Sequence, residues 1–173
     1  MKRLIIDMDN VMADISTQFQ TWYTRRTGLV IDPKSLIGKH EPDAFPDAEL
    51  AWNFLFTPGF FRTVPVMKDS QHIIAELNKK YEVFIVSAAM EFPQSLPEKI
   101  DWLKEHFVFI SWKQIVFCGS KSVIKGDCMI DDYVRNLEPF DGEKLLYTAP
   151  HNQLIEWHDR VNNWQEVGER LLL

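Results

Sequence analysis

The sequence has little cysteine and no extended hydrophobic segment. Among its 173 residues there are two cysteines, Cys118 and Cys128. Both fall in apolar segments typical of core strands, so we expect buried free thiols rather than a disulfide. The apolar stretch behind the first three residues covers only residues 4–6, which is too short for a secretory signal. Both features predict a cytoplasmic protein.

Positive charge is also scarce. The chain carries 19 Lys and Arg against 25 Asp and Glu, which gives a formal net charge of −6. This balance argues against a nucleic-acid polymer or an anionic membrane surface as the partner. Hydrophobic residues make up 46% of the chain without forming a membrane-length run. We therefore expect a globular protein that is long enough to bury a substantial core.

Short apolar segments alternate with helical patterns along the chain. The apolar segments are residues 4–6, 82–87, 114–118, 128–130 and 144–148. Short buried strands that end in turn residues are typical of a parallel sheet. Apolar residues at helical spacing predict helices over residues 69–80, 97–107 and 162–172. We predict an α/β fold with a doubly wound, five-stranded parallel sheet and right-handed crossovers.

Residues 12–67 are far more than one crossover connection needs. This stretch contains two apolar helical patterns, one around Trp22 and one around Trp52, with loops between them. Because the stretch directly follows the first strand, it would lie over the carboxyl edge of the sheet. We predict a helical cap at residues 12–67, inserted into an α/β core domain formed by residues 1–11 and 68–173.

Two aspartates, Asp7 and Asp9, directly follow the first apolar segment. Successive side chains of a buried strand point to opposite faces, so these two cannot both be ordinary surface charges of the strand. The expected arrangement places Asp7 at the carboxyl end of the strand, with Asp9 returning above it. Ligands bind at this edge of open α/β sheets. Two carboxylates there suit a bound cation and phosphoryl chemistry.

The other predicted strands also end in chemically useful groups. Ser87 ends the second strand, Lys121 lies in the loop after the third, and Asp131 and Asp132 follow the fourth. Lys125, four residues further on, competes with Lys121 for this place.

This ordered set resembles the haloacid dehalogenase superfamily of phosphoryl-transfer enzymes, whose four motifs match Asp7-x-Asp9, Ser87, Lys121 and Asp131-Asp132. Further segments resemble the 5′(3′)-deoxyribonucleotidase family within it. They are Asp7-Met-Asp-Asn-Val-Met-Ala-Asp14, Pro58-Gly59-Phe60-Phe61 ahead of Pro65, and Met129-Ile130-Asp131-Asp132. Asn10 stands where many relatives have glycine, and asparagine tolerates the same left-handed turn.

The resemblance implies a role for each acidic residue. Asp7 would be the nucleophile that forms an aspartyl-phosphate, and Asp9 would protonate the leaving oxygen and later activate water. Mg²⁺ prefers oxygen ligands. The Asp7 carboxylate, the Asp9 backbone carbonyl and either Asp131 or Asp132 would hold it, with Asp131 slightly favoured.

The resemblance also implies phosphate and substrate contacts. Ser87 and the backbone amides that follow it, beginning at Ala88, would bind phosphate oxygens together with Lys121. Ala88 replaces the hydroxyl residue that relatives often carry there. The resemblance favours Lys121 over Lys125, because Lys121 is followed by a hydroxyl residue and precedes Asp131 by ten positions, as in the family pattern. Phe60 and Phe61 would stack on a nucleobase or pack between cap and core, and the sequence leaves both readings open.

The resemblance implies a Mg²⁺-dependent phosphomonoesterase whose small-molecule partner is a phosphate ester, most directly a deoxyribonucleoside monophosphate. It leaves a homodimer open. One alternative is a phosphatase for another metabolite, since cap residues set specificity. The other is a phosphoacceptor signalling domain. Such domains have no helical insertion after the first strand, so residues 12–67 argue against it.

Overall fold

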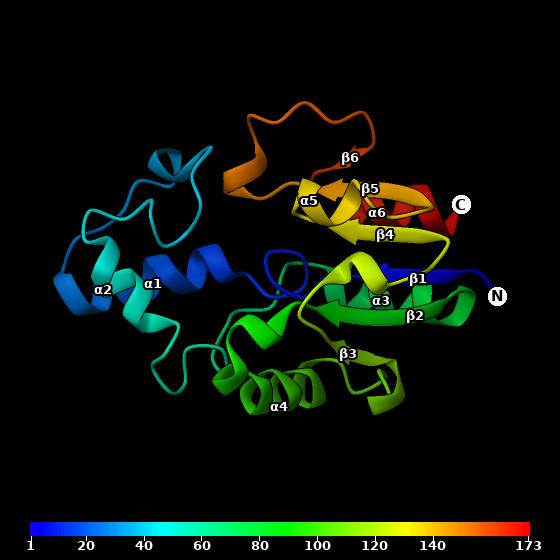
Figure 1. Cartoon of the computed structure of the whole chain (residues 1–173), viewed down its shortest axis with the longest axis horizontal. Coiled ribbons are helices and arrows are strands. Elements are labelled where there is room, and N and C mark those ends of the chain that lie inside the picture. The colour runs from blue at the N-terminus through cyan, green and yellow to red at the C-terminus, as the bar shows by residue number, and fades with distance from the viewer.

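The computed structural model describes all 173 residues. Its centre is a parallel six-stranded sheet in the order β3-β2-β1-β4-β5-β6 (Figure 1). The strands are β1 Arg3–Ile6, β2 Glu82–Ser87, β3 Ile115–Phe117, β4 Cys128–Asp131, β5 Glu143–Tyr147 and β6 Arg160–Val161. The order places β1 between β2 and β4, which is the arrangement of a doubly wound sheet.

The prediction of five strands is wrong, because β6 adds a sixth strand at the edge of the sheet. Residue Arg160 pairs with Leu146 and Val161 pairs with Tyr147. A strand of two residues is too short to show either an apolar run or an alternating pattern. The remaining five strands lie where the sequence predicts them, within a few residues at their ends.

Six α-helices connect or flank the strands. They are α1 Ile15–Thr27, α2 Ala48–Phe54, α3 Ser70–Lys80, α4 Leu96–His106, α5 Val134–Leu137 and α6 Trp164–Leu172. The predicted helices over 69–80, 97–107 and 162–172 correspond to α3, α4 and α6. None of these helices combines the length and the apolar character that crossing a bilayer requires.

Both faces of the sheet are buried. Leu4 and Ile6 of β1 belong to the larger core cluster, which also contains residues of α3, α4 and α6. Ile5 points the other way, into a smaller cluster with Leu137 of α5. A strand buried on both faces must be apolar throughout, which explains the unbroken apolar run of β1. Of the two cysteines, Cys128 is buried as expected, whereas Cys118 is only half-buried.

The segment between β1 and α3 lies beyond the carboxyl ends of the strands, where α1 and α2 face the sheet edge (Figure 1). Its two ends are tied together at the base. The amide of Asp14 donates to the carbonyl of Pro65 at 2.8 Å, and the amide of Met67 donates to the carbonyl of Met12, also at 2.8 Å. This pairing joins the outgoing and returning chains just above the acidic turn after β1.

The same segment has an aromatic core of its own. Phe60 is fully buried and packs against Phe19 with ring centroids 4.8 Å apart, and against Trp22 at 5.2 Å. Tyr23 and Phe45 extend this cluster, with their ring centroids 5.0 Å apart. The aromatic residues between β1 and α3 therefore hold this segment together as a packed unit.

A buried tryptophan ties α6 to the acidic turn. Trp164 is fully buried, and its indole N–H donates to the carbonyl of Val11 at 2.7 Å. Trp164→Phe should lower the free energy of unfolding by about 1–3 kcal/mol, because it leaves that buried carbonyl unpaired. Urea denaturation measures the loss. The control Trp112→Phe, at a side chain that is 77% exposed, should stay within about 0.5 kcal/mol of the parent. Equal losses in both variants would contradict this account.

Candidate active site

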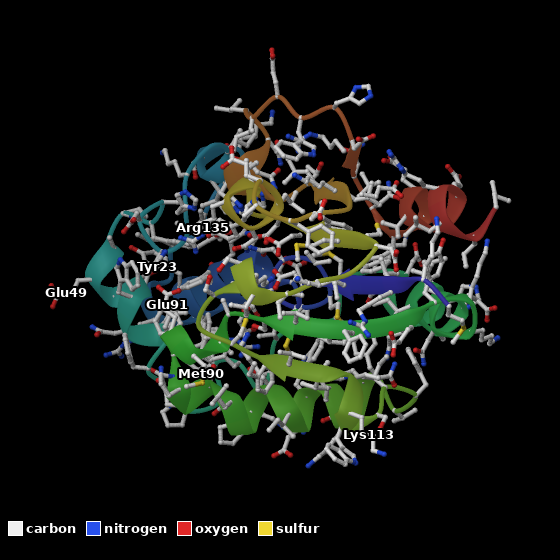
Figure 2. All side chains as sticks on the ribbon, turned by 45° about the vertical axis from the view of Figure 1, so that its right-hand side comes forward. Tyr23, Glu49, Met90, Glu91, Lys113 and Arg135 are labelled. Atoms are coloured by element: carbon white, nitrogen blue, oxygen red, sulfur yellow. The ribbon has the colours of Figure 1, made fainter.

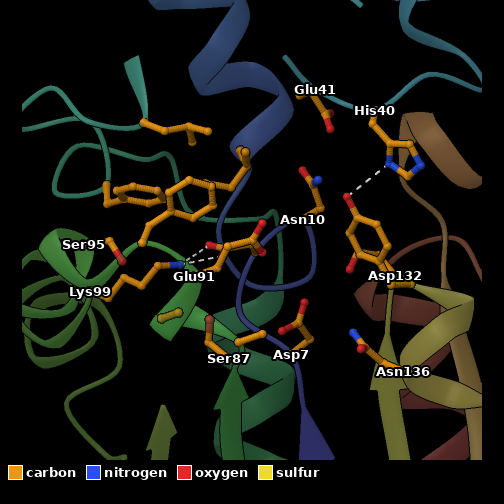
Figure 3. Close-up of a pocket in the computed structure, with 18 of the residues that line it drawn as sticks. Asp7, Asn10, His40, Glu41, Ser87, Glu91, Ser95, Lys99, Asp132 and Asn136 are labelled. Atoms are coloured by element: carbon orange, nitrogen blue, oxygen red, sulfur yellow. Dashed lines mark hydrogen bonds and ion pairs between the residues drawn. The ribbon is translucent and has the colours of Figure 1, made fainter. Parts of the chain in front are cut away.

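The carboxyl ends of the central strands meet in one pocket. Asp7 directly follows β1, Ser87 is the last residue of β2, and Asp131 ends β4. The pocket has a volume of about 330 Å³ and lies between these strand ends and the α1–α2 segment (Figure 3). This volume falls within the range of small-molecule sites.

Lys121 lies at the centre of the acidic group. Its ammonium group is buried, donates to the carboxylate of Asp7, and donates to Asp131 Oδ2 at 2.6 Å. Burial alone would lower the pKa of Lys121, but the carboxylates of Asp7 and Asp131 outweigh it and raise the pKa. Lys121 is therefore a fixed cation. Lys125, the competing candidate, is exposed and does not line the pocket.

The two aspartates after β4 have different surroundings. Asp131 has a complete set of partners, because it accepts from Lys121, from the amide of Tyr133 at 2.9 Å and from the side-chain amide of Asn136 at 2.9 Å. Asp132 is also buried, yet neither of its carboxylate oxygens has a hydrogen-bond partner. A buried carboxylate without hydrogen-bond partners is costly, so the oxygens of Asp132 are suited to bind a cation.

The charges of the site also favour a bound cation. Ligand oxygens of Asp7, Asp131 and Asp132 lie within 4.8 Å of one another, and Lys121 is the only ammonium that contacts them. Burial, together with the neighbouring carboxylates, raises the pKa of Asp132, and burial also raises the pKa of Asp7. A divalent cation would remove this excess negative charge. A donor set made only of carboxylate oxygens fits Mg²⁺ and does not fit a soft metal.

Asp9 lies on the turn that follows β1. Asn10 adopts a left-handed conformation with φ of 56°, as expected for the residue that reverses the chain there. The side chain of Asp9 is 36% exposed, and both of its oxygens accept from the ammonium of Lys99, at 2.6 and 2.5 Å (Figure 3). Asp9 therefore lines the pocket, and its carboxylate is hydrogen-bonded to Lys99.

Lys99 is a pocket residue that sequence reasoning missed. It lies on α4 and is buried, in line with Trp102 and Leu103 on the apolar face of that helix. Residues three and four positions apart share one face of a helix. The sequence did contain a signal for this residue, because a lysine three and four positions before Trp102 and Leu103 shares the buried face of the helix and must find a partner there.

The structure separates the two phenylalanines that were candidates for substrate contact. Phe61 lines the pocket, together with Ile15, Phe19, Ser87 and Ala88. Phe60 does not line it, because its ring is fully buried in the aromatic cluster described above. Of the two readings of Phe60, core packing is the one that accounts for its position.

The outer part of the pocket contains polar groups that the sequence did not single out. The hydroxyl of Ser16 contacts the half-buried carboxyl group of Glu41 and Asn10 Oδ1, and desolvation raises the pKa of Glu41. His40 Nδ1 lies 3.2 Å from the hydroxyl of Tyr133 (Figure 3). Glu91 and Arg135 come from the turn after β2 and from α5, on the side that faces the α1–α2 segment (Figure 2), and both line the pocket. Both signs of charge therefore occur around its mouth.

Comparison with known sequences identifies the family. A sequence model described as 5′ nucleotidase, deoxy (pyrimidine), cytosolic type C protein matches residues 2–173. The chain belongs to this deoxyribonucleotidase family. It is 38% identical to the 5′(3′)-deoxyribonucleotidase of Bacillus subtilis over 173 residues, which covers 99% of this chain and 100% of that protein. The 5′(3′)-deoxyribonucleotidase of Bacillus phage SPbeta matches with the same identity and coverage.

Solved structures support the fold of this deoxyribonucleotidase family member. A haloacid dehalogenase-like hydrolase from Streptococcus pneumoniae superimposes with a TM-score of 0.55, covering 86% of this chain and 85% of that one, at 13% identity. At that identity the likeness concerns the fold alone, which is haloacid dehalogenase-like. The predictions of an enzyme and of its family are confirmed.

Proposed function

We propose that this protein is a Mg²⁺-dependent phosphomonoesterase that hydrolyses deoxyribonucleoside monophosphates through an aspartyl-phosphate. The observation that carries the proposal is the convergence of Asp7, Ser87, Lys121 and Asp132 in one pocket, with Asp9 beside them. The family and the curated relatives favour this substrate class, since those relatives are named 5′(3′)-deoxyribonucleotidases.

Asp7 is the proposed nucleophile. One of its carboxylate oxygens would attack phosphorus as the bond to the ester oxygen breaks, and the phosphoryl group would remain on Asp7. Lys121 contacts Asp7 directly, so its ammonium is placed to bind a phosphate oxygen and to stabilise the negative charge of the transferring group. Ser87 and the backbone amide of Ala88 line the same pocket and would bind further phosphate oxygens.

Asp9 is the proposed acid and base. It would give a proton to the leaving ester oxygen in the first step and take one from the attacking water in the second. Water then attacks phosphorus, which releases inorganic phosphate and restores the Asp7 carboxylate.

The metal fits Asp132 best. Asp7, Asp132 and the backbone carbonyl of Asp9 would hold Mg²⁺, while Asp131 would orient Lys121 through the contact at 2.6 Å. This assignment reverses the slight preference for Asp131, because the Asp131 carboxylate already accepts three hydrogen bonds and the Asp132 carboxylate accepts none. The cation, when bound, lets an anionic nucleophile approach an anionic phosphate.

We assign residues 12–67 to a helical cap and residues 1–11 and 68–173 to the core domain. The backbone pairing of residues 12–14 with 65–67 supports this boundary, because it closes the insertion at its base. The cap contributes Phe61, Phe19 and Ile15 to the pocket, and these apolar side chains would contact the nucleobase. A cap of this kind excludes water while the strand ends carry out the chemistry.

The two neighbouring phenylalanines should respond differently to the same change. Phe61→Leu removes an aromatic face from the pocket and should raise KM for a deoxynucleotide by about 3- to 10-fold. The ring of Phe60 does not line the pocket but packs against Phe61 and Phe19, so Phe60→Leu should lower stability by about 1–2 kcal/mol and change KM much less than Phe61→Leu does. Steady-state kinetics and urea denaturation of both variants separate the effects. A raised KM in Phe60→Leu alone would contradict the assignment.

Phosphate release from a panel of substrates tests the proposal. The panel contains 5′ and 3′ deoxyribonucleoside monophosphates, their ribonucleotide counterparts and small sugar phosphates, each with Mg²⁺ and with EDTA. The proposal predicts metal-dependent hydrolysis that favours deoxyribonucleotides. Activity confined to sugar phosphates would be consistent with the proposed mechanism but would contradict the proposed substrate class. A stable phosphoprotein after treatment with acetyl phosphate, without turnover of any ester, would favour the signalling alternative.

A further inference from the structure

Lys99 is a buried cation that the proposed reaction does not yet use. Its side chain is 2% exposed, although it lies within reach of a pocket that is open to solvent. Burying a lysine is costly unless its ammonium group is paired. Lys99 lies on the buried face of α4, at the point where this helix approaches Asp9.

The contacts of Lys99 are few and specific. Its ammonium group donates to both oxygens of Asp9, at 2.6 and 2.5 Å, and lies 4.8 Å from the centroid of the Phe61 ring. It makes no ion pair with Asp7 or Asp131, both of which pair with Lys121. The two buried lysines of the site therefore serve different carboxylates.

Asp9 needs such a partner because of where it lies. It follows β1 on a turn, outside the strand ladder, and its side chain is 36% exposed. A carboxyl group there would sample several rotamers, whereas proton transfer requires it within hydrogen-bond reach of the ester oxygen. Two hydrogen bonds from one rigidly packed ammonium group restrict both oxygens at once.

We propose that Lys99 is a positioning residue, which holds the carboxyl group of Asp9 toward the ester oxygen that leaves. The inference rests on the proposed function and deepens it. In this step one oxygen of Asp9 would carry the proton and the other would accept from Lys99. As the bond between phosphorus and the ester oxygen breaks and the bond to Asp7 forms, the protonated oxygen of Asp9 would pass its proton to the departing oxygen. Lys99 keeps its own protons and touches neither the phosphate nor the ester. Its contribution is the orientation of Asp9.

Leaving-group dependence tests this role. Phenyl phosphate and p-nitrophenyl phosphate have similar shapes, but phenol is a poor leaving group that needs protonation and p-nitrophenol is a good one that does not. The measurement is kcat/KM for both esters, which reports the steps up to the first cleavage. Lys99→Met should lower kcat/KM for phenyl phosphate by about 100-fold, the cost of misplacing a reacting group by about 1 Å. The loss for p-nitrophenyl phosphate should be far smaller.

Two further variants sharpen the result. Lys104→Met makes the same change on an exposed side chain of α4 and should match the parent for both esters. Lys99→Gln keeps one amide donor for Asp9, so its ratio of the two kcat/KM values should fall between those of the parent and Lys99→Met. Thermal unfolding identifies a variant that loses its fold, and in that case Lys99→Gln carries the test.

The outcomes separate this inference from the proposed function. If the parent hydrolyses neither aryl ester nor any nucleotide, the proposed function fails and the role of Lys99 fails with it. If the parent is active and a folded Lys99 variant loses the same factor for both esters, or gains activity on phenyl phosphate, the positioning role is overturned while the proposed function stands.

Discussion

Asp7→Asn is expected to reduce phosphate release by about 10⁴- to 10⁶-fold, the loss seen when an enzyme is deprived of its nucleophile. The neutral amide of asparagine cannot form the bond to phosphorus that we propose for the Asp7 carboxylate. The variant keeps the shape of the side chain, and it removes one charge from a group of three buried carboxylates in which only Asp7 and Asp131 contact an ammonium, that of Lys121. We therefore expect it to fold.

Phosphate release at saturating Mg²⁺ and substrate, together with urea denaturation, checks both parts of this prediction. Asp101→Asn makes the same change at a side chain that is 59% exposed on α4, and it should leave activity and stability unchanged. Substantial turnover by a folded Asp7→Asn protein would show that another group attacks phosphorus.

Asp132→Asn is expected to weaken Mg²⁺ binding by at least about 10- to 100-fold, which is the loss caused by removing even an indirect partner of a metal. Both oxygens of Asp132 are buried without hydrogen-bond partners, which is why we propose them as ligands of Mg²⁺. Calorimetric titration with Mg²⁺ measures the affinity, and the Mg²⁺ dependence of turnover provides a second reading.

Asp131→Asn is the matched comparison, because it makes the same change one residue away. Asp131 accepts from Lys121, Tyr133 and Asn136, so its loss should disturb Lys121 and lower kcat with a smaller effect on Mg²⁺ affinity. If Asp131→Asn abolished Mg²⁺ binding and Asp132→Asn did not, the two assignments would have to be exchanged.

Most of the sheet was predictable because its strands are buried on both faces and therefore apolar throughout. The strand β6 was not, since two residues carry no periodicity and their pairing with β5 depends on the path of the preceding loop. The convergence of Asp7, Ser87, Lys121 and Asp131 could be predicted for a related reason. Parallel strands place all their carboxyl ends at one edge, so groups at strand ends must meet.

The remaining parts of the site depend on tertiary packing. Asp131 and Asp132 are adjacent residues of the same type, so the sequence alone cannot assign their roles. Only the hydrogen-bond partners around each carboxylate distinguish them. Phe60 and Phe61 are likewise adjacent, and the path of the returning chain decides which ring faces the pocket. Lys99 lies 90 positions from Asp9, in a helix that has no motif of its own. Contacts of this kind follow from how the cap and α4 pack against the turn after β1.

Trapping of the phosphoryl group on Asp7 tests the central claim most directly. The Asp9→Asn variant should slow hydrolysis of the intermediate, so it is mixed with p-nitrophenyl phosphate and Mg²⁺, quenched in acid and digested for mass spectrometry. The account predicts a single phosphoryl group on the peptide that contains Asp7, and none in the doubly substituted Asp7→Asn, Asp9→Asn protein. A phosphoryl group on Ser87 or Asp132, or p-nitrophenol release by Asp9→Asn without any covalent phosphoprotein, would contradict it.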